Sequence, residues 1–116
     1  APPMADTWRY LAPLNALPAH PGVELHCLFG SGMDTPLRLQ YEGGDFDREP
    51  TRVMGPGDKS VLQPSLEFCR GFAKKQPGVA VHPVDLPGLE HHTSIQDPRV
   101  IAYVRAVAKD VAMSRT

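Results

Sequence analysis

The stretch that decides the fold reads Val23-Glu24-Leu25-His26-Cys27-Leu28-Phe29 and is followed directly by Gly30-Ser31-Gly32. Apolar side chains alternate along it, and Leu28 is apolar as well, which predicts a mostly buried strand that ends at a glycine turn. A second strand is predicted at residues 79–86, which read Val-Ala-Val-His-Pro-Val-Asp-Leu. Pro83 cannot donate a ladder hydrogen bond, so this strand should lie at an edge or close to a strand end.

Helical patterns follow both strands. Residues 65–75 carry apolar side chains at helical spacing and end on two lysines, which predicts a helix. Residues 98–112 repeat apolar side chains every three or four positions and follow an Asp97-Pro98 pair, a helix cap with proline at the first helical position. Residues 37–41 and 52–54 flank a polar loop and predict a short hairpin.

The order of strand, helix, strand and helix predicts an α/β fold with a parallel sheet, because a helical crossover between parallel strands covers one face of that sheet. Two or three strands with so few helices cannot cover both faces, so we expect part of a larger sheet. The proline-rich residues 1–22 predict an extended arm with at most one helical turn.

Composition excludes several classes of protein. The 116 residues allow one small domain, and 12 Lys+Arg against 13 Asp+Glu leave no basic stripe for a nucleic-acid partner. No apolar run reaches the roughly 18 residues of a membrane span. The 13 Pro and 10 Gly punctuate apolar runs, which is typical of a loop-rich folded chain. The first residue is Ala1, with no initiator Met or signal segment, so we expect a mature or cleaved product.

Asp58 and His91 are the candidate site residues. Each follows a predicted strand, at 52–54 and 79–86, and the 33 residues between them match one strand-helix-strand step. Loops after neighbouring parallel strands open on the same edge, so the two side chains should meet there. A carboxylate that orients an imidazole is the acid and base half of a hydrolytic triad, and in α/β-hydrolases Asp precedes His along the chain.

Simpler interpretations compete with this one. An Asp in a Gly-Asp turn is more often a turn former than a catalytic acid, and adjacent His91 and His92 point to different sides of the backbone. Cys27 and Cys69 are equally compatible with two buried thiols. The histidines lack the spacing and the cysteine pairs of common zinc sites, so neither a metal ligand nor a cofactor is predicted. The sequence contains no Gly-x-Ser-x-Gly nucleophile motif.

Colinear segments from about residue 21 to 108 carry a specific resemblance to a known family. They are Pro21-Gly22-Val23-Glu24-Leu25-His26-Cys27-Leu28-Phe29-Gly30, Thr35-Pro36, Tyr41, Phe46-Asp47-Arg48-Glu49-Pro50, Gly57-Asp58-Lys59-Ser60-Val61, Ser65-Leu66-Glu67-Phe68-Cys69 and Leu86-Pro87-Gly88-Leu89-Glu90-His91. They resemble the C-terminal third of the lecithin:cholesterol acyltransferase family, which includes the lysosomal phospholipase. The resemblance implies that residues 21–116 are the C-terminal segment of an α/β-hydrolase domain and that residues 1–20 are an extended arm or a linker derived from its cap.

The resemblance also assigns roles to single residues. Asp58 matches the triad acid, His91 matches the general base, and Cys27 with Cys69 matches a disulfide between a strand and the following helix. Lys59 stands where the family usually has glycine, and a lysine cation that paired with Asp58 would compete with the imidazole for the carboxylate. The nucleophile, the oxyanion donors and the lid lie upstream in the family.

The function that the resemblance implies is that of the C-terminal chain of a split phospholipase/acyltransferase. Its expected partners are an N-terminal chain of the same precursor carrying the serine, a phospholipid, a sterol or other alcohol acceptor, and a membrane or lipoprotein surface. The expected compartment is the secretory pathway, either secreted or in the lumen of a lysosome, vacuole or similar organelle. The alternative is a non-catalytic relic or interaction module that binds a partner through its unpaired sheet edge.

Overall fold

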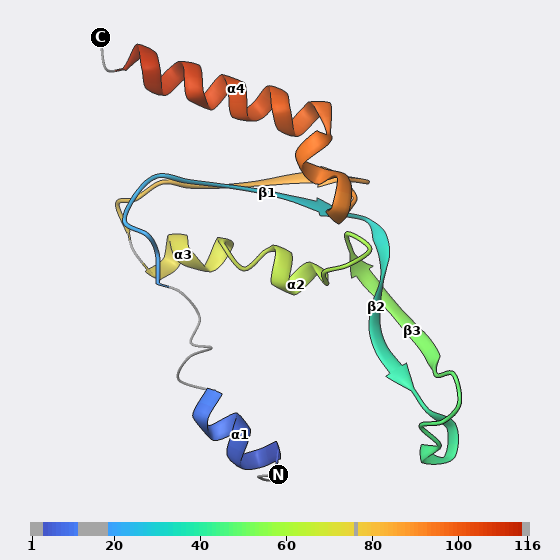
Figure 1. The fold of residues 1–116 in the computed structure, drawn as a ribbon. Helices are drawn as coiled ribbons and strands as arrows, with labels where there is room; N and C mark the ends of the chain where they lie inside the picture. Colours follow the sequence, from blue (N-terminus) through green and yellow to red (C-terminus); the bar gives the residue numbers. More distant parts are fainter. Residues whose placement is uncertain (1–3, 12–18, 76, 115–116) are drawn as a thin grey trace.

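The computed structural model describes residues 4–11, 19–75 and 77–114 (Figure 1). Its elements, with η marking a 3-10 helix, are α1 (Met4–Leu11), β1 (Leu25–Ser31), β2 (Met33–Gln40), η1 (Glu42–Gly44), β3 (Thr51–Gly57), α2 (Gln63–Leu66), α3 (Arg70–Lys75), β4 (Val81–Pro87), η2 (His91–Gln96) and α4 (Pro98–Met113).

Strands β1 and β4 form a parallel pair, which confirms the predicted parallel α/β arrangement of this part of the chain. The register runs from Leu25 opposite Val81 to Ser31 opposite Pro87. Helices α2 and α3 lie on one side of the pair, and α4 lies on the other (Figure 1). β1 continues two residues into the expected glycine turn, and the chain turns at Gly32, whose φ of 76° favours glycine.

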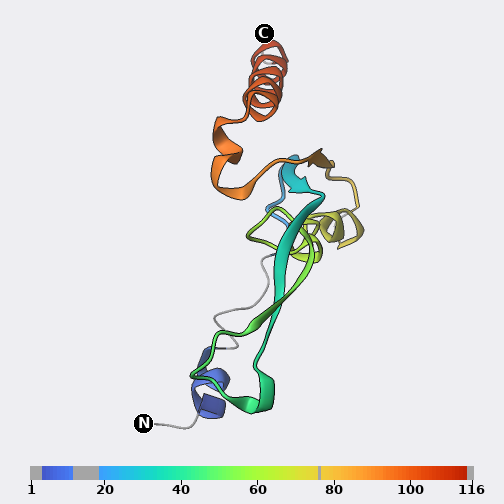
Figure 2. The ribbon, with the colours of Figure 1, turned by 90° about the vertical axis from the view of Figure 1, so that its right-hand side faces the viewer.

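The predicted hairpin is present and is longer than expected. Strands β2 and β3 pair antiparallel from Met33 opposite Gly57 to Gln40 opposite Thr51, with an irregularity between Pro36 and Arg38. Figure 2 shows the β2–β3 hairpin extending away from the β1–β4 pair. The hairpin therefore leaves β1 and returns to it, so that the end of β3 lies beside the end of β1.

The helix predicted over 65–75 is interrupted. Helix α2 ends at Leu66, and α3 begins at Arg70, with residues 67–69 in turns. Amides bond three residues back across this junction, including Arg70 to Glu67 and Phe72 to Cys69, which is the tighter 3-10 pattern. The tighter winding directs both Cys69 and Phe72 into the core, where they are buried.

The expectation of at most one helical turn near the N-terminus is wrong. Helix α1 spans eight residues, because its segment lies between prolines and contains none itself. Asp6 in its first turn pairs with Arg9 at 3.6 Å. The other parts of the expected arm, residues 1–3 and 12–18, lie outside the described residues.

Helix α4 begins as predicted at Asp97-Pro98. An Asp97 carboxylate oxygen accepts a hydrogen bond from the Arg99 amide at 2.8 Å, and the Arg99 side chain donates to the Pro87 carbonyl at 2.9 Å. Arg99 thus connects the start of α4 to the end of β4. No helix in the described residues has the length and apolar character that crossing a membrane requires.

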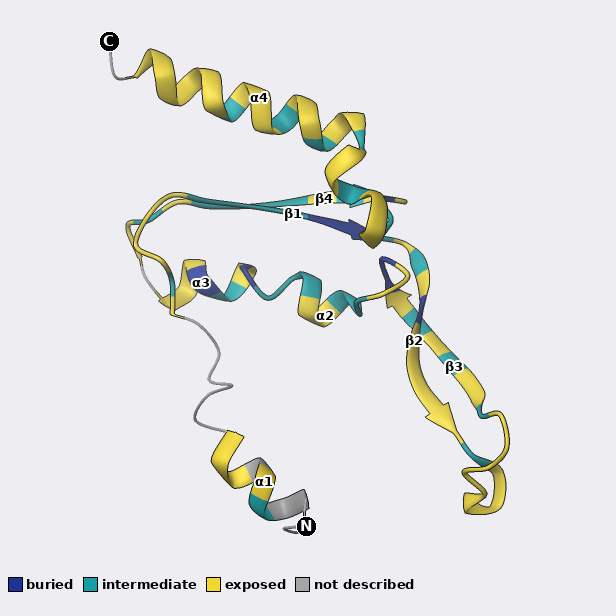
Figure 3. Ribbon diagram, in the orientation of Figure 1, coloured by how far each residue is buried: buried dark blue, intermediate teal, exposed yellow. Residues whose placement is uncertain are grey.

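The hydrophobic core is small. Among the described residues, its buried apolar side chains are those of Phe29, Cys69, Phe72 and Leu89, and most of α4 is exposed (Figure 3). The radius of gyration is 19.0 Å, against about 13 Å for a compact chain of this length. These values support the expectation that more of a sheet is needed to cover the exposed apolar side chains.

Candidate active site

Asp58 directly follows β3, and its side chain is buried, with the whole residue only 3% exposed. One carboxylate oxygen, Oδ1, accepts hydrogen bonds from the backbone amides of Ser60 at 3.1 Å and Val61 at 2.8 Å. The Asp58 amide in turn donates to the Val61 carbonyl at 3.2 Å. The loop that follows β3 therefore holds this carboxylate in one orientation.

The second carboxylate oxygen of Asp58 faces His91. Its Oδ2 lies 2.9 Å from Nδ1 of the imidazole, and the His91 amide donates to the Asp58 carbonyl at 3.1 Å. The His91 side chain is half exposed, and among the described residues its Nε2 has no hydrogen-bond partner. The structure thus brings together the two residues that the sequence predicted to meet. The arrangement can hold an imidazole in the tautomer that leaves Nε2 free to accept a proton.

The route by which the chain brings them together differs from the predicted one. β3 pairs with β2 and not with β1 or β4, so the two loops do not follow neighbouring parallel strands. Asp58 instead lies against Gly30 near the end of β1, while His91 follows β4, which is the parallel partner of β1. A Cβ at Gly30 would overlap the Leu89 carbonyl oxygen and lie 3.1 Å from the Asp58 Cβ, so this close approach requires glycine.

The pKa of Asp58 results from opposing effects. Burial of the carboxyl raises the pKa, but hydrogen bonds from Val61, His91 and Ser60 lower it, and the charge of His91 lowers it further. The net effect is a pKa below the ordinary Asp value. The carboxylate is therefore ionised when it faces the imidazole, as stabilising an imidazolium requires.

Lys59 does not pair with Asp58, so its cation does not compete with the imidazole for that carboxylate. The Lys59 ammonium lies 2.8 Å from a carboxylate oxygen of Glu90, so its cation is directed away from the Asp58 carboxylate. Its backbone φ is 78°, the left-handed region, and its amide donates to the buried Thr35 hydroxyl at 3.0 Å. Lys59 thus adopts the left-handed conformation that glycine adopts most easily.

Two residues near the site belong to the segments that carry the family resemblance, but the sequence assigned neither of them a role. Thr35 is completely buried in β2, and its hydroxyl links the Lys59 amide to the Met33 carbonyl. Glu90 precedes His91 and receives the Lys59 cation. A threonine in a strand and a surface glutamate are both common, so neither residue type indicates such a role. His92 lies apart from Asp58, with its Nε2 3.3 Å from the Ser60 hydroxyl.

Cys27 on β1 and Cys69 at the junction of α2 and α3 lie side by side as free thiols. Burial raises the pKa of the Cys27 thiol to about 12, with a further increase from its hydrogen bond to Cys69 and from the charge of that group. The structure thus brings the two cysteines together but contains no bond between them. Their pairing as a disulfide stays a prediction.

A small hollow lies beside the Asp58–His91 pair. Its volume is about 170 Å³, and its lining residues are Leu28, Phe29, Gly30, Asp58, Leu66, Leu89, His91 and Ser94. The lining is mainly apolar around one carboxylate, one imidazole and one hydroxyl. The hollow therefore places an apolar surface beside the buried carboxylate and the half-exposed imidazole.

Comparison with known proteins identifies the family. The family model for lecithin:cholesterol acyltransferase matches residues 5–104. The chain belongs to the lecithin:cholesterol acyltransferase family. The resemblance drawn from the sequence motifs is thereby confirmed.

The relatives carry names of lipid enzymes. The lysosomal phospholipase A and acyltransferase of Mus musculus is 38% identical over 87 residues, which cover 75% of this chain and 21% of that protein. The human protein of the same name is 37% identical over 90 residues, with the same shares covered. The phosphatidylcholine-sterol acyltransferase of Papio anubis is 34% identical over 95 residues, or 81% of this chain and 21% of that protein. The chain spans about a fifth of the length of these relatives.

Proposed function

We propose that this chain provides the acid and the base of a Ser-Asp-His triad in an α/β-hydrolase that cleaves phospholipid acyl esters and transfers the acyl group. The observation that supports this most is the contact between Asp58 and His91, with the carboxylate held by two amides and the imidazole Nε2 free. The family supplies the class of reaction. The 116 residues contain no Gly-x-Ser-x-Gly motif, so the nucleophilic serine lies outside them, and we place it on an N-terminal chain of the same precursor.

The mechanism has two half-reactions. In the first, His91 Nε2 takes the proton of the serine hydroxyl as the serine oxygen attacks the ester carbonyl. The tetrahedral intermediate collapses, the imidazolium gives its proton to the leaving lysophospholipid oxygen, and an acyl-serine remains. In the second, His91 takes a proton from an alcohol or water, which attacks the acyl-serine, and the proton returns to the serine oxygen. Asp58 stabilises the imidazolium in both.

The substrates follow from the names of the relatives. A phospholipid is the proposed acyl donor, and a sterol, another alcohol or water is the proposed acceptor. Because such lipids are located in membranes and lipoproteins, the proposed site of action is a membrane or lipoprotein surface. The word lysosomal in the names of the mouse and human relatives supports a compartment of the secretory pathway for this protein.

The test is an ester hydrolysis assay on the protein assembled with the serine-bearing chain, using a short-chain ester and a phosphatidylcholine vesicle. His91→Ala should lower kcat by at least about 100-fold, because the serine hydroxyl loses its base. His92→Ala is the matched control and should change kcat by less than about 3-fold. Loss on His92→Ala with His91→Ala tolerated would move the base by one residue. Activity unaffected by either would leave the chain as an interaction module.

The secretory assignment also carries the proposed disulfide between Cys27 and Cys69. A bridge between them would close a loop of about 43 residues. In the loop-entropy model, the lost conformational entropy of the unfolded chain would raise the free energy of unfolding by about 4 kcal/mol. Thiol titration of denatured protein taken from its native compartment should find no free thiol. Two reactive thiols would remove both the bridge and its support for the compartment.

A further inference from the structure

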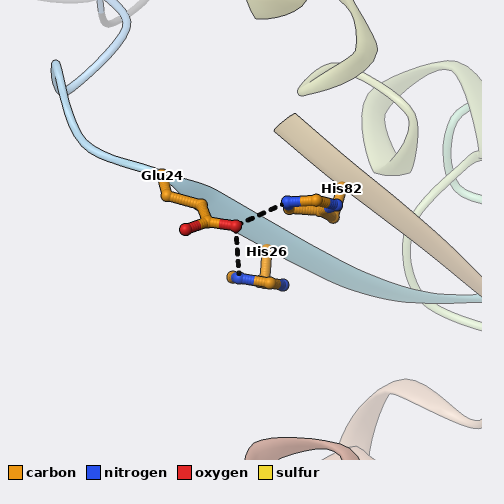
Figure 4. A group of neighbouring side chains, drawn as sticks. All are labelled: Glu24, His26 and His82. Atoms are coloured by element: carbon orange, nitrogen blue, oxygen red, sulfur yellow. Dashed lines mark hydrogen bonds and ion pairs between the residues drawn. The ribbon is translucent and has the colours of Figure 1, made fainter. Parts of the chain in front are cut away.

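A second group of a carboxylate and imidazoles lies at the opposite end of the β1–β4 pair (Figure 4). Glu24 immediately precedes β1, His26 is the second residue of β1, and His82 is the second residue of β4. His26 and His82 are register partners on parallel strands, and Glu24 lies two residues before His26. Side chains two residues apart on a strand share a face, so the register brings all three together.

The three side chains bring one ligand atom each close together. Glu24 Oε1 lies 2.7 Å from His82 Nε2 and 3.6 Å from His26 Nε2. One ligand atom from each residue lies within 4.8 Å of the others. The two imidazole rings stack with centroids 4.5 Å apart and an angle of 14° between their planes. Within the described residues, this is the group that brings three such atoms together.

We propose that Glu24, His26 and His82 bind a zinc ion. Two imidazoles and a carboxylate are the donor types of open zinc sites, whereas calcium and magnesium prefer oxygen donors alone. Zinc bonds of 2.0–2.2 Å in a tetrahedron separate the donor atoms by about 3.4 Å, a value between the two distances from Glu24. The side chains of Glu24 and His82 are 59% and 43% exposed, so both have room to rotate toward the ion, and water can complete the coordination.

Tyr103 on α4 supports the ligating form of His26. Its hydroxyl oxygen lies 2.9 Å from His26 Nδ1, and in the zinc-bound form that nitrogen donates its hydrogen to the hydroxyl. This hydrogen bond leaves the lone pair of Nε2 directed toward Glu24 and the ion, the usual supporting contact of a ligating histidine. The ion would then join β1 to β4 and, through Tyr103, to α4.

The position assigns the ion a structural role. The strands run about 3.3 Å per residue, so five residues of β1 separate His26 from the end of the strand beside Asp58 by about 16 Å. An ion at that distance contacts no reacting atom of the proposed triad. Its effect is to tie the first residues of both strands, which are only partly buried.

The test is a calorimetric titration of the intact, chelator-treated protein with zinc chloride at about pH 7.5, where histidine is mostly neutral. Wild type should bind one equivalent. His26→Gln and His82→Gln should each weaken binding by at least ten-fold, and Tyr103→Phe should weaken it by about ten-fold. His92→Gln is the matched control, since it removes an exposed histidine outside the group, and it should bind like wild type. Zinc should raise the melting temperature of wild type and His92→Gln by the same amount, and that of His26→Gln, His82→Gln and Tyr103→Phe by less.

The proposal would be overturned by no saturable zinc binding, by binding that survives both His26→Gln and His82→Gln, or by binding lost in His91→Gln, which would put the ion on the triad imidazole. Cobalt in place of zinc should give visible bands without the near-ultraviolet thiolate band, and that band would assign the ion to Cys27 and Cys69. Glu24→Gln keeps the test decisive if a histidine variant fails to fold, because Glu24 precedes the strand and is mostly exposed.

Discussion

The two ends of the β1–β4 pair use the same side-chain chemistry in different surroundings. At the carboxyl end, Asp58 is buried, two amides hold one of its oxygens, and the other oxygen faces one imidazole. At the amino end, Glu24 is mostly exposed, and one of its oxygens faces two imidazoles. Burial and the number of partners, more than the residue types, separate an orienting carboxylate from a ligating one.

The difference has a chemical consequence. The amides fix the orientation of the Asp58 carboxylate before any substrate arrives, so His91 has one preferred tautomer. Glu24 has no such backbone donors within the described residues, and it can reorient toward an ion. The first arrangement suits proton transfer, and the second suits binding.

The largest predicted effect separates the two carboxylates by activity. Asp58→Asn in the assembled protein should lower kcat for ester hydrolysis by at least about 100-fold, because an amide favours the wrong tautomer and cannot stabilise the imidazolium. Glu24→Gln should change kcat by less than about 3-fold. Equal effects from the two variants in the same assay would end the distinction between the two ends.

The next effect tests the packing of the carboxyl end. Gly30→Ala should lower the free energy of unfolding by about 2–3 kcal/mol, because its Cβ would overlap the backbone carbonyl of Leu89. Gly71→Ala in α3 is the matched control, since nothing lies within 4 Å of a Cβ there, and alanine should stabilise that helix by up to about 1 kcal/mol. Urea unfolding curves measure both. A neutral Gly30→Ala would show that this contact does not constrain the site.

A smaller effect is expected in acid. The pKa of Asp58 is lower in the folded protein than its ordinary value, so its contribution to stability is complete above about pH 5 and is lost as the pH falls. Asp58→Asn removes this contribution, so its free energy of unfolding should decline less steeply than that of wild type between about pH 5 and 3. Asp47→Asn, an exposed loop variant, should follow wild type. Parallel curves for wild type and Asp58→Asn would contradict the assignment.

The smallest effect concerns Lys59. Lys59→Gly relieves a left-handed backbone but also frees the unfolded chain and removes the surface ion pair with Glu90, so the net gain in unfolding free energy should stay below about 1 kcal/mol. Glu90→Gln isolates the ion pair and should cost less than about 1 kcal/mol. The denaturant midpoints of the two variants separate the effect of the left-handed backbone from that of the ion pair. A loss above about 2 kcal/mol on Lys59→Gly would give the lysine a larger role than its contacts explain.

Local patterns in the sequence predicted the elements that local interactions determine. The alternating apolar side chains before Gly30 predicted β1, and the Asp97-Pro98 cap predicted the start of α4. The interruption between α2 and α3 was not predicted, because it depends on how Cys69 and Phe72 pack against the sheet. A helical period alone does not contain that information.

Contacts between distant segments were predictable only in part. The contact between Asp58 and His91 was predicted correctly. The prediction placed β3 beside β4 in one parallel sheet, whereas β3 pairs with β2. The direction of the Lys59 side chain depends on a left-handed φ, which the sequence does not indicate for lysine. His26 and His82 are partners only because of the register between β1 and β4, which a long connection separates in the sequence. Their spacing in the sequence therefore did not indicate a shared site.

The most direct test of the account is the tautomer of His91, read from nitrogen–proton correlation spectra of histidine-labelled protein assembled with its serine-bearing chain. The account predicts a proton on Nδ1, hydrogen-bonded to Asp58, and an unprotonated Nε2 at neutral pH, with the tautomer changed in Asp58→Asn and unchanged in Glu24→Gln. A proton on Nε2 in wild type, or spectra that Asp58→Asn leaves unchanged, would contradict it.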